Sequence, residues 1–183
     1  DVYVLTSSDE AEALMSQTIN NFAALREKNV TPRSTIFFLG RENFPHNYLP
    51  KEHKYKLGEA QVVFDNVEGE AEKFDKSVTI IAAGPLLHQA LEAAYELEKN
   101  NIGAFVVNPS IINKPDVLTI ASCLRNTKGK LLTVEDHQKM GGLGSLLSYE
   151  LAMAGTPFTL KSLAVNGVFG QSSYKAVELY KMH

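Results

Sequence analysis

The chain has 183 residues, of which 44% are hydrophobic and 21% are charged, a composition typical of one globular domain or one and a half. Its formal net charge of −3 offers no basic surface, so nucleic acid is not expected as a partner. No apolar run approaches the roughly 20 residues of a membrane-spanning helix, so we expect no membrane partner. The single cysteine, Cys123, excludes an internal disulfide, and we therefore expect a cytoplasmic protein.

The first 40 residues predict a β–α–β unit. The apolar segments Val2–Leu5 and Ser34–Leu39 predict its two strands. Between them, Ser7 and Glu10 stand at capping-box spacing ahead of a helix that ends before Thr31-Pro32. The strands are apolar on both faces, yet only one helix is present to cover them, and so small a unit does not bury enough surface to stand alone. We therefore expect a partial unit whose sheet continues upstream of the first residue or in a partner chain.

A domain boundary is predicted in an irregular, proline-containing stretch, and it divides the chain into residues 1–54 and 55–183. After the boundary, Gly58–Phe64 predicts a strand, and the acidic stretch Asp65–Asp75 predicts a hairpin loop. We expect the next strand, Ser77–Ala83, to pair antiparallel with the strand before it.

From this point onward, strands and helices alternate along the chain. The further strands are Ile102–Val107, Lys130–Val134 and Phe158–Val165, and the helices run from Pro85 and then over Pro115–Arg125, Gly142–Ala154 and Ser172–Met182. This alternation predicts an α/β fold: a doubly wound, mostly parallel five-stranded sheet with one antiparallel strand and helices on both faces, preceded by the partial β–α–β unit.

The stretch Gly129–Gly144, GKLLTVEDHQKMGGLG, predicts a strand, then a loop that holds two acids and a histidine, then a helix opened by glycines. Three glycines close the stretch and are compatible with a dinucleotide-binding loop. Their spacing is poor, because Leu147 stands where the third glycine of that motif would fall, and the preceding acids would repel a pyrophosphate. We interpret the glycines as a helix start that packs closely on its strand.

Glu135, Asp136 and His137 are candidates for an acid/base cluster or a metal site. No second histidine or cysteine lies at ligand spacing, and successive loop residues cannot all face one substrate. We favour the alternative that they cap the following turn or make polar contacts across an interface. The chain shows no self-contained catalytic set, and Cys123, on the apolar face of a predicted helix, is interpreted as a small core residue.

Arg41 follows the second strand directly, at the edge where ligands of parallel sheets bind. An arginine there suits a phosphate group, to which it donates bidentate hydrogen bonds. The alternative is a surface arginine paired with Glu42 or Glu10. Both interpretations of Arg41 stay open at this point.

Several motifs, in order, resemble the C-terminal portion of transketolases. They are T-V-E-D-H followed by G-G-L-G within Lys130–Gly144, Val78–Gly84 with Leu87–Leu91, Asn108-Pro109 with Lys114-Pro115, and Leu163–Asn166. Upstream, Gly40–Asn43 and Gly58–Val63 resemble the end of the pyrimidine-binding domain and the start of the transketolase C-terminal domain. The resemblance covers nearly the whole chain.

The resemblance implies transfer of a two-carbon ketol unit between sugar phosphates by a homodimer that uses thiamine diphosphate and Mg²⁺. It also implies that the domains holding these cofactors lie outside the chain, so the chain alone should bind neither and be inactive. Arg41 matches the family arginine that binds the substrate phosphate, although Gly40 replaces the usual serine before it. Glu135, Asp136 and His137 would lie near the subunit interface or the site entrance.

Two further hypotheses remain. A 2-oxo acid dehydrogenase β subunit or a deoxyxylulose-phosphate synthase shares the fold, but these relatives usually show Glu-Glu in place of Glu135-Asp136 and lack the histidine at 137. A non-catalytic regulatory or assembly module on the same fold is the second, because fold does not determine function.

Overall fold

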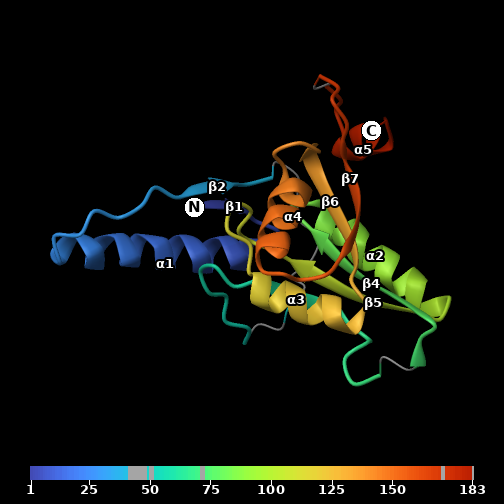
Figure 1. The fold of residues 1–183 in the computed structure, drawn as a ribbon. Coiled ribbons are helices and arrows are strands. Elements are labelled where there is room, and N and C mark those ends of the chain that lie inside the picture. Colours follow the sequence, from blue (N-terminus) through green and yellow to red (C-terminus); the bar gives the residue numbers. More distant parts are fainter. Residues whose placement is uncertain (41–48, 50–51, 71–72, 170–171, 183) are drawn as a thin grey trace.

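The computed structural model describes residues 1–40, 49, 52–70, 73–169 and 172–182. Its strands are β1 (Val2–Val4), β2 (Ile36–Phe38), β3 (Gln61–Asp65), β4 (Lys76–Ala82), β5 (Ile102–Asn108), β6 (Lys130–Gln138) and β7 (Thr159–Val165). Its helices are α1 (Ser8–Glu27), α2 (Leu86–Lys99), α3 (Val117–Asn126), α4 (Leu143–Met153) and α5 (Ala176–Met182). Figure 1 shows a layered body around β4 to β7, with α1, β1 and β2 extending from one side and α5 lying beyond the end of β7.

Strands β3 to β7 form one sheet in the order β3-β5-β4-β6-β7, and every neighbouring pair is parallel except β3 and β5. This confirms the predicted five-stranded α/β fold with one antiparallel strand. The predicted hairpin between β3 and β4 is wrong, because β5 lies between them. The Asp65 carboxylate accepts the N–H groups of Val67 and Glu68, and this turn leads the chain away from β3 instead of folding it back.

The two faces of the sheet bury alternate side chains of the same strands, as the two-residue period of a strand requires. One face packs against α2 through Ile80, Ala82, Ala104, Val106, Leu87, Ala90 and Ala94. The other face packs against α3 and α4 through Ile81, Ala83, Phe105, Val107, Ile120, Leu124, Leu147 and Leu151. In Figure 1, α2 and α4 accordingly lie on opposite sides of the strands. Burial on both faces explains why β4 and β5 are continuous apolar runs.

Strands β1 and β2 form a separate parallel pair, and together with α1 they make up what we call the N-terminal unit. The segment that leaves β5 is hydrogen-bonded to this unit. Val4 N–H donates to the Ser110 carbonyl at 2.9 Å, and Ile112 N–H donates to the Val2 carbonyl at 2.8 Å. A small core fills the space between α1 and this segment: Tyr3, Leu5, Leu14, Tyr55 and Ile111.

The N-terminal unit carries exposed apolar side chains on both α1 and β2. The exposed fraction is 66% for Ile19 of α1, and it is 52% for Ile36 and 57% for Phe38 of β2. Exposed apolar side chains grouped on one unit are typical of a surface that another layer covers. None of the described helices has the length and hydropathy that crossing a membrane requires.

Helices α3 and α5 begin two and four residues later than predicted, because side chains form turns ahead of them. Helix α3 follows Asp116, whose carboxylate accepts the Thr119 N–H at 3.2 Å and caps the helix. Helix α5 begins at Ala176, after a turn in which Ser173 Oγ accepts the Lys175 N–H at 3.4 Å.

Candidate functional site at the strand ends

A cavity of about 450 Å³ lies where the N-terminal unit meets the five-stranded sheet, and we call it the junction cavity. Its lining includes Phe38 of β2 with Gly40 after it, Ala83 directly after β4, Glu135–His137 of β6, and Leu143 of α4. Strands β2, β4 and β6 reach the cavity with their carboxyl ends. This is the edge at which ligands of parallel sheets bind.

The order of the strands explains why a cavity forms at this edge. The chain leaves β4 through α2 towards β5 on one side, whereas it leaves β6 through α4 towards β7 on the other side. The two connections diverge, and a crevice opens between them at such a switch point. Pro85 after β4 and Glu135–His137 of β6 are the residues that these diverging connections bring to the cavity.

Glu135 caps α4 instead of facing a ligand. Only 5% of its surface is exposed. Its Oε2 accepts the Leu143 N–H at 2.6 Å, and its Oε1 accepts the Gly144 N–H at 2.9 Å. Burial raises the pKa of this carboxyl group, while the two N–H groups oppose the shift. The hydrogen bonds confirm the interpretation that this acid caps the following turn.

The glycines that open α4 make room for that carboxylate. A Cβ atom at Gly142 would lie 2.1 Å from Glu135 Oε2, and one at Gly144 would lie 2.7 Å from Thr133 Oγ1. Both distances are shorter than real side-chain contacts, so the close packing of α4 on β6 explains the two glycines without a dinucleotide. The interpretation made from their spacing is confirmed.

Asp136 and His137 lie in β6 and not in a loop, which corrects the sequence prediction. The pairing of β6 with β7 is irregular between Val134 and Gln138 and resumes at Gln138. The apolar pattern ends at Val134, so it did not reveal that the strand continues. Both side chains are exposed and line the junction cavity.

The described residues of the junction cavity do not fit thiamine diphosphate or a metal ion. The charged side chains on its described wall are two carboxylates, Glu135 and Asp136, and no described lysine or arginine lines it to balance the charge of a diphosphate. Within the described part of the chain, no group of three or more His, Cys, Asp or Glu side chains is placed to hold a metal ion. No reaction step is therefore assigned to either group at this cavity.

Arg41 lies outside the described residues, so its role as a phosphate ligand stays a prediction. Its predecessor Gly40 lines the junction cavity. Of the two ion-pair partners considered for Arg41, Glu42 is also outside the described residues. Glu10 is fully buried and its carboxylate is engaged elsewhere.

A polar network around Glu10 was not predicted from the sequence. Ser7 Oγ accepts the Glu10 N–H at 3.2 Å, as the capping spacing indicated. The Glu10 carboxylate accepts the Thr6 N–H at 2.8 Å and an Asn108 Nδ2–H at 3.0 Å, and it also accepts the Ser110 hydroxyl. The sequence feature that could have indicated this network is Asn108-Pro109-Ser110, which places polar side chains at the end of a buried strand.

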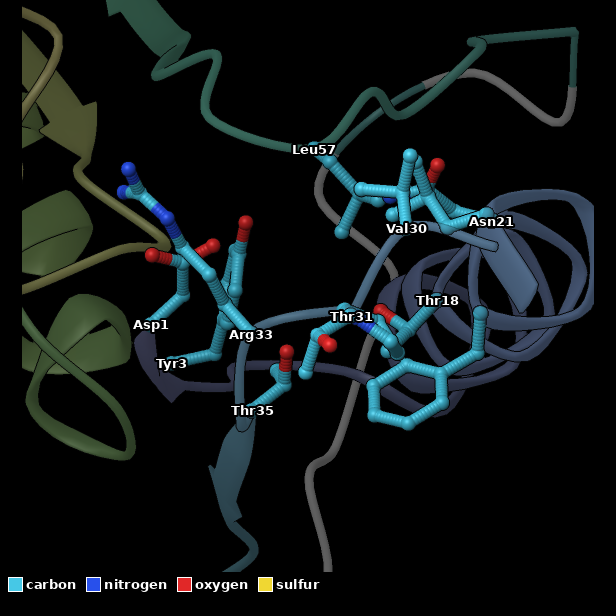
Figure 2. A pocket seen from close by; sticks show the side chains of 12 residues that line it. Asp1, Tyr3, Thr18, Asn21, Val30, Thr31, Arg33, Thr35 and Leu57 are labelled. Atoms are coloured by element: carbon cyan, nitrogen blue, oxygen red, sulfur yellow. The ribbon is translucent and has the colours of Figure 1, made fainter. Parts of the chain in front are cut away.

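A second, smaller cavity of about 250 Å³ lies in the N-terminal unit, between α1 and the segment that leads into β2 (Figure 2). In this view, Thr18 and Asn21 lie on the α1 side, while Arg33 extends near Asp1 and Tyr3 on the other side. Arg33 is exposed, and the polar groups do not converge on one point. No function is assigned to this cavity.

Comparison with known proteins shows similarity to transketolases. The family described as "Transketolase, C-terminal domain" matches residues 68–183. Transketolase of Homo sapiens is 41% identical over 152 residues, covering 82% of this chain and 21% of that protein. Transketolase of Rattus norvegicus is 38% identical with the same coverage, and transketolase-like protein 2 of Homo sapiens is 36% identical over 137 residues.

A solved structure described as "Split gene transketolase, inactive beta4 tetramer" matches with a TM-score of 0.73 and 28% identity. The match covers 98% of this chain and 51% of that chain. The chain spans about a fifth of the length of the transketolases of Homo sapiens and Rattus norvegicus. The family match over residues 68–183 includes β4, β6 and α4, which form most of the junction cavity. The chain therefore belongs to the transketolase C-terminal domain family.

Proposed function

We propose that the chain is the C-terminal part of a thiamine diphosphate-dependent transketolase, which transfers a two-carbon ketol unit between sugar phosphates in the cytoplasm. In this proposal, residues 55–183 are the transketolase C-terminal domain and residues 1–54 are the end of the pyrimidine-binding domain. The chain supports homodimerisation and contributes Arg41 to the substrate phosphate site. Thiamine diphosphate and Mg²⁺ are held by domains outside it, and the chain alone is inactive.

The position of the junction cavity carries this proposal. Gly40 lies on the cavity wall, so Arg41 follows directly on a residue of that wall. An arginine guanidinium group offers the planar, paired donors that phosphate prefers. Glu135–His137 and the start of α4 also line the cavity, and they lie within the residues that match the transketolase C-terminal domain family.

The exposed apolar side chains of the N-terminal unit support a role within a larger enzyme. Ile19, Ile36 and Phe38 are more than half exposed, although apolar strands of this kind are normally covered on both faces. In this proposal, the rest of the pyrimidine-binding domain covers them. The coverage of only 21% of human transketolase agrees with this assignment.

Calorimetry and an activity assay test the proposal. Thiamine diphosphate with Mg²⁺ is titrated into the 183-residue chain, and ketol transfer from a ketose phosphate to an aldose phosphate is measured. We expect neither binding nor transfer by the chain alone, and transfer once a second polypeptide supplies the N-terminal transketolase domains. Tight cofactor binding by the chain alone would contradict the proposal, as would a stable but inactive complex with those domains.

Replacement of Arg41 tests its role in the assembled enzyme. We expect Arg41→Ala to raise the KM for a phosphorylated substrate about 10- to 100-fold, because a charge-assisted bidentate contact is lost. Arg41→Lys should have an intermediate effect, since a lysine keeps the charge but not the paired geometry. Arg33→Ala, an exposed arginine of the N-terminal unit, is the control. An equal rise for an unphosphorylated substrate would show that Arg41 does not recognise the phosphate.

A second candidate function is a non-catalytic assembly module. The observation in its favour is the similarity to a solved structure described as an inactive β4 tetramer. Gel filtration of the chain, followed by the mixing experiment, separates the two. A stable homo-oligomer that does not combine with N-terminal transketolase domains favours the assembly module.

A further inference from the structure

The carboxylate of Glu135 lies at the N-terminus of α4, a position that favours an anion. Helix α4 begins after Gly142, an N-cap residue that has no side chain to bond the free N–H groups of the first turn. The Glu135 carboxylate accepts two of them, from Leu143 and Gly144. The positive end of the helix dipole adds to the attraction for a negative charge at this point.

Two buried hydroxyl groups lie beside the same helix end. Thr133 of β6 and Ser162 of β7 are paired across the strands, and Thr133 is fully buried. Neither Thr133 Oγ1 nor Ser162 Oγ has a hydrogen-bond partner among the described residues. A Cβ atom at Gly144 would lie 2.7 Å from the first and 3.1 Å from the second. The surroundings of Gly144 therefore hold two hydroxyl groups whose donors are unused, in addition to the two N–H groups that donate to Glu135.

Glu135 also joins two walls of the junction cavity. Its backbone continues into Asp136 and His137 on the β6 wall, and its carboxylate holds the first turn of α4, where Leu143 and Leu146 form the adjoining wall. One side chain thus links the two walls.

We propose that Glu135 is an internal oxyanion that positions the start of α4 against β6, and with it a wall of the junction cavity, and that inorganic phosphate occupies the same donors when the carboxylate is removed. The proposal goes beyond the proposed function and is independent of it, because every group involved belongs to this chain. In the wild-type chain, the Glu135 carboxylate occupies these donors, so we propose no binding of a free anion at the G-G-L-G sequence.

Thermal unfolding of Glu135→Ala tests the proposal. Sodium phosphate is raised to about 100 mM while sodium chloride is lowered to keep the ionic strength constant, so that a stabilisation reports binding. Without phosphate, we expect the Tm of the variant to fall by about 2–8 °C, because a helix cap is lost. Phosphate should restore at least half of this shift and leave the wild-type Tm unchanged.

Asp136→Ala is the matched control, because it removes the same charge from the next residue of β6, where the side chain is exposed. Burial raises the pKa of the Asp136 carboxyl group, so its removal should not lower the Tm, and we expect no response to phosphate. A destabilised Glu135→Ala variant that does not respond to phosphate would overturn the proposal. Equal stabilisation of all three proteins by phosphate would also overturn it, because it would show an adventitious ion only.

Hydrogen exchange at the Leu143 and Gly144 amides provides a second measurement. We expect exchange of these two amides to be at least about tenfold faster in Glu135→Ala, and to slow when phosphate is added. If that variant does not fold, Glu135→Gln replaces it. A glutamine keeps an acceptor for one N–H but directs its own NH₂ group at the other, so one amide should stay protected while the other loses protection. Unchanged exchange at both amides in the variant would overturn the proposal.

Discussion

Burial determines the chemistry of Cys123. Its thiol lies in the core between the sheet and α3, with 4% of the residue exposed, as predicted for a small core residue. Burial raises its pKa from 9.0 to about 11, and Asp65 adds to the shift. Because only the thiolate attacks disulfide reagents, we expect the native thiol to resist labelling at about pH 8 and to react once the chain unfolds.

The same shift predicts how stability depends on pH. The folded thiol holds its proton more tightly than the unfolded one, so the contribution to stability is complete below pH 9.0 and is lost as the pH rises to about 11. The free energy of unfolding of Cys123→Ala, measured in urea, should fall less over this interval than that of the wild type. Equal falls would contradict the prediction.

At the scale of elements, the seating of α4 on β6 and β7 depends on Gly144. In an exposed helix, Gly→Ala stabilises by about 1 kcal/mol. Here the added methyl group would lie 2.7 Å from Thr133 Oγ1, so we expect Gly144→Ala to destabilise by about 1–3 kcal/mol instead. In a Thr133→Ala background the closest obstacle is gone and Ser162 Oγ, at 3.1 Å, remains, so the same substitution should destabilise less.

A double-mutant cycle in urea measures this coupling. Strict additivity of the two substitutions would show that Thr133 does not limit the approach of α4. The result would also test the close-packing interpretation of the glycines, which the spacing alone could not distinguish fully from a dinucleotide loop.

At the scale of the whole molecule, Glu10 connects the N-terminal unit to the five-stranded sheet. Its carboxylate is fully buried and accepts hydrogen bonds from Thr6 within the unit, from Asn108 at the end of β5 and from Ser110 just after it. We expect Glu10→Ala to lower the free energy of unfolding by about 2–4 kcal/mol, because several buried donors lose their acceptor. Glu10→Gln should be intermediate, since it keeps one acceptor oxygen.

Hydrogen exchange shows whether Glu10→Ala loosens the junction. The Val4 and Ile112 amides bond between the unit and the segment after β5, and they should exchange faster than the amides of β4. Glu12→Ala, an exposed residue of the same helix, is the control and should change stability by less than about 0.5 kcal/mol. Uniform loss of protection across the whole sheet would contradict a local role at the junction.

The sequence by itself determined the elements of this protein and its class. The continuous apolar runs of β4, β5 and the first part of β6 predict strands covered on both faces, and their alternation with helical patterns predicts the doubly wound sheet. These signals are local, because side-chain periodicity reflects burial of the element that carries it. The position of Arg41 at a strand end was predicted from the same kind of local pattern, and its role stays a prediction.

Only the tertiary structure decided which strands are neighbours and where the buried acids point. The place of β5 between β3 and β4, and the bond between Glu10 and Asn108, 98 residues apart, depend on contacts between distant segments that local periodicity does not encode. The sequence showed Glu135 beside glycines, but only the folded chain brings its carboxylate to the Leu143 and Gly144 amides. The junction cavity likewise exists only because the N-terminal unit meets the strand ends of a sheet formed by later residues.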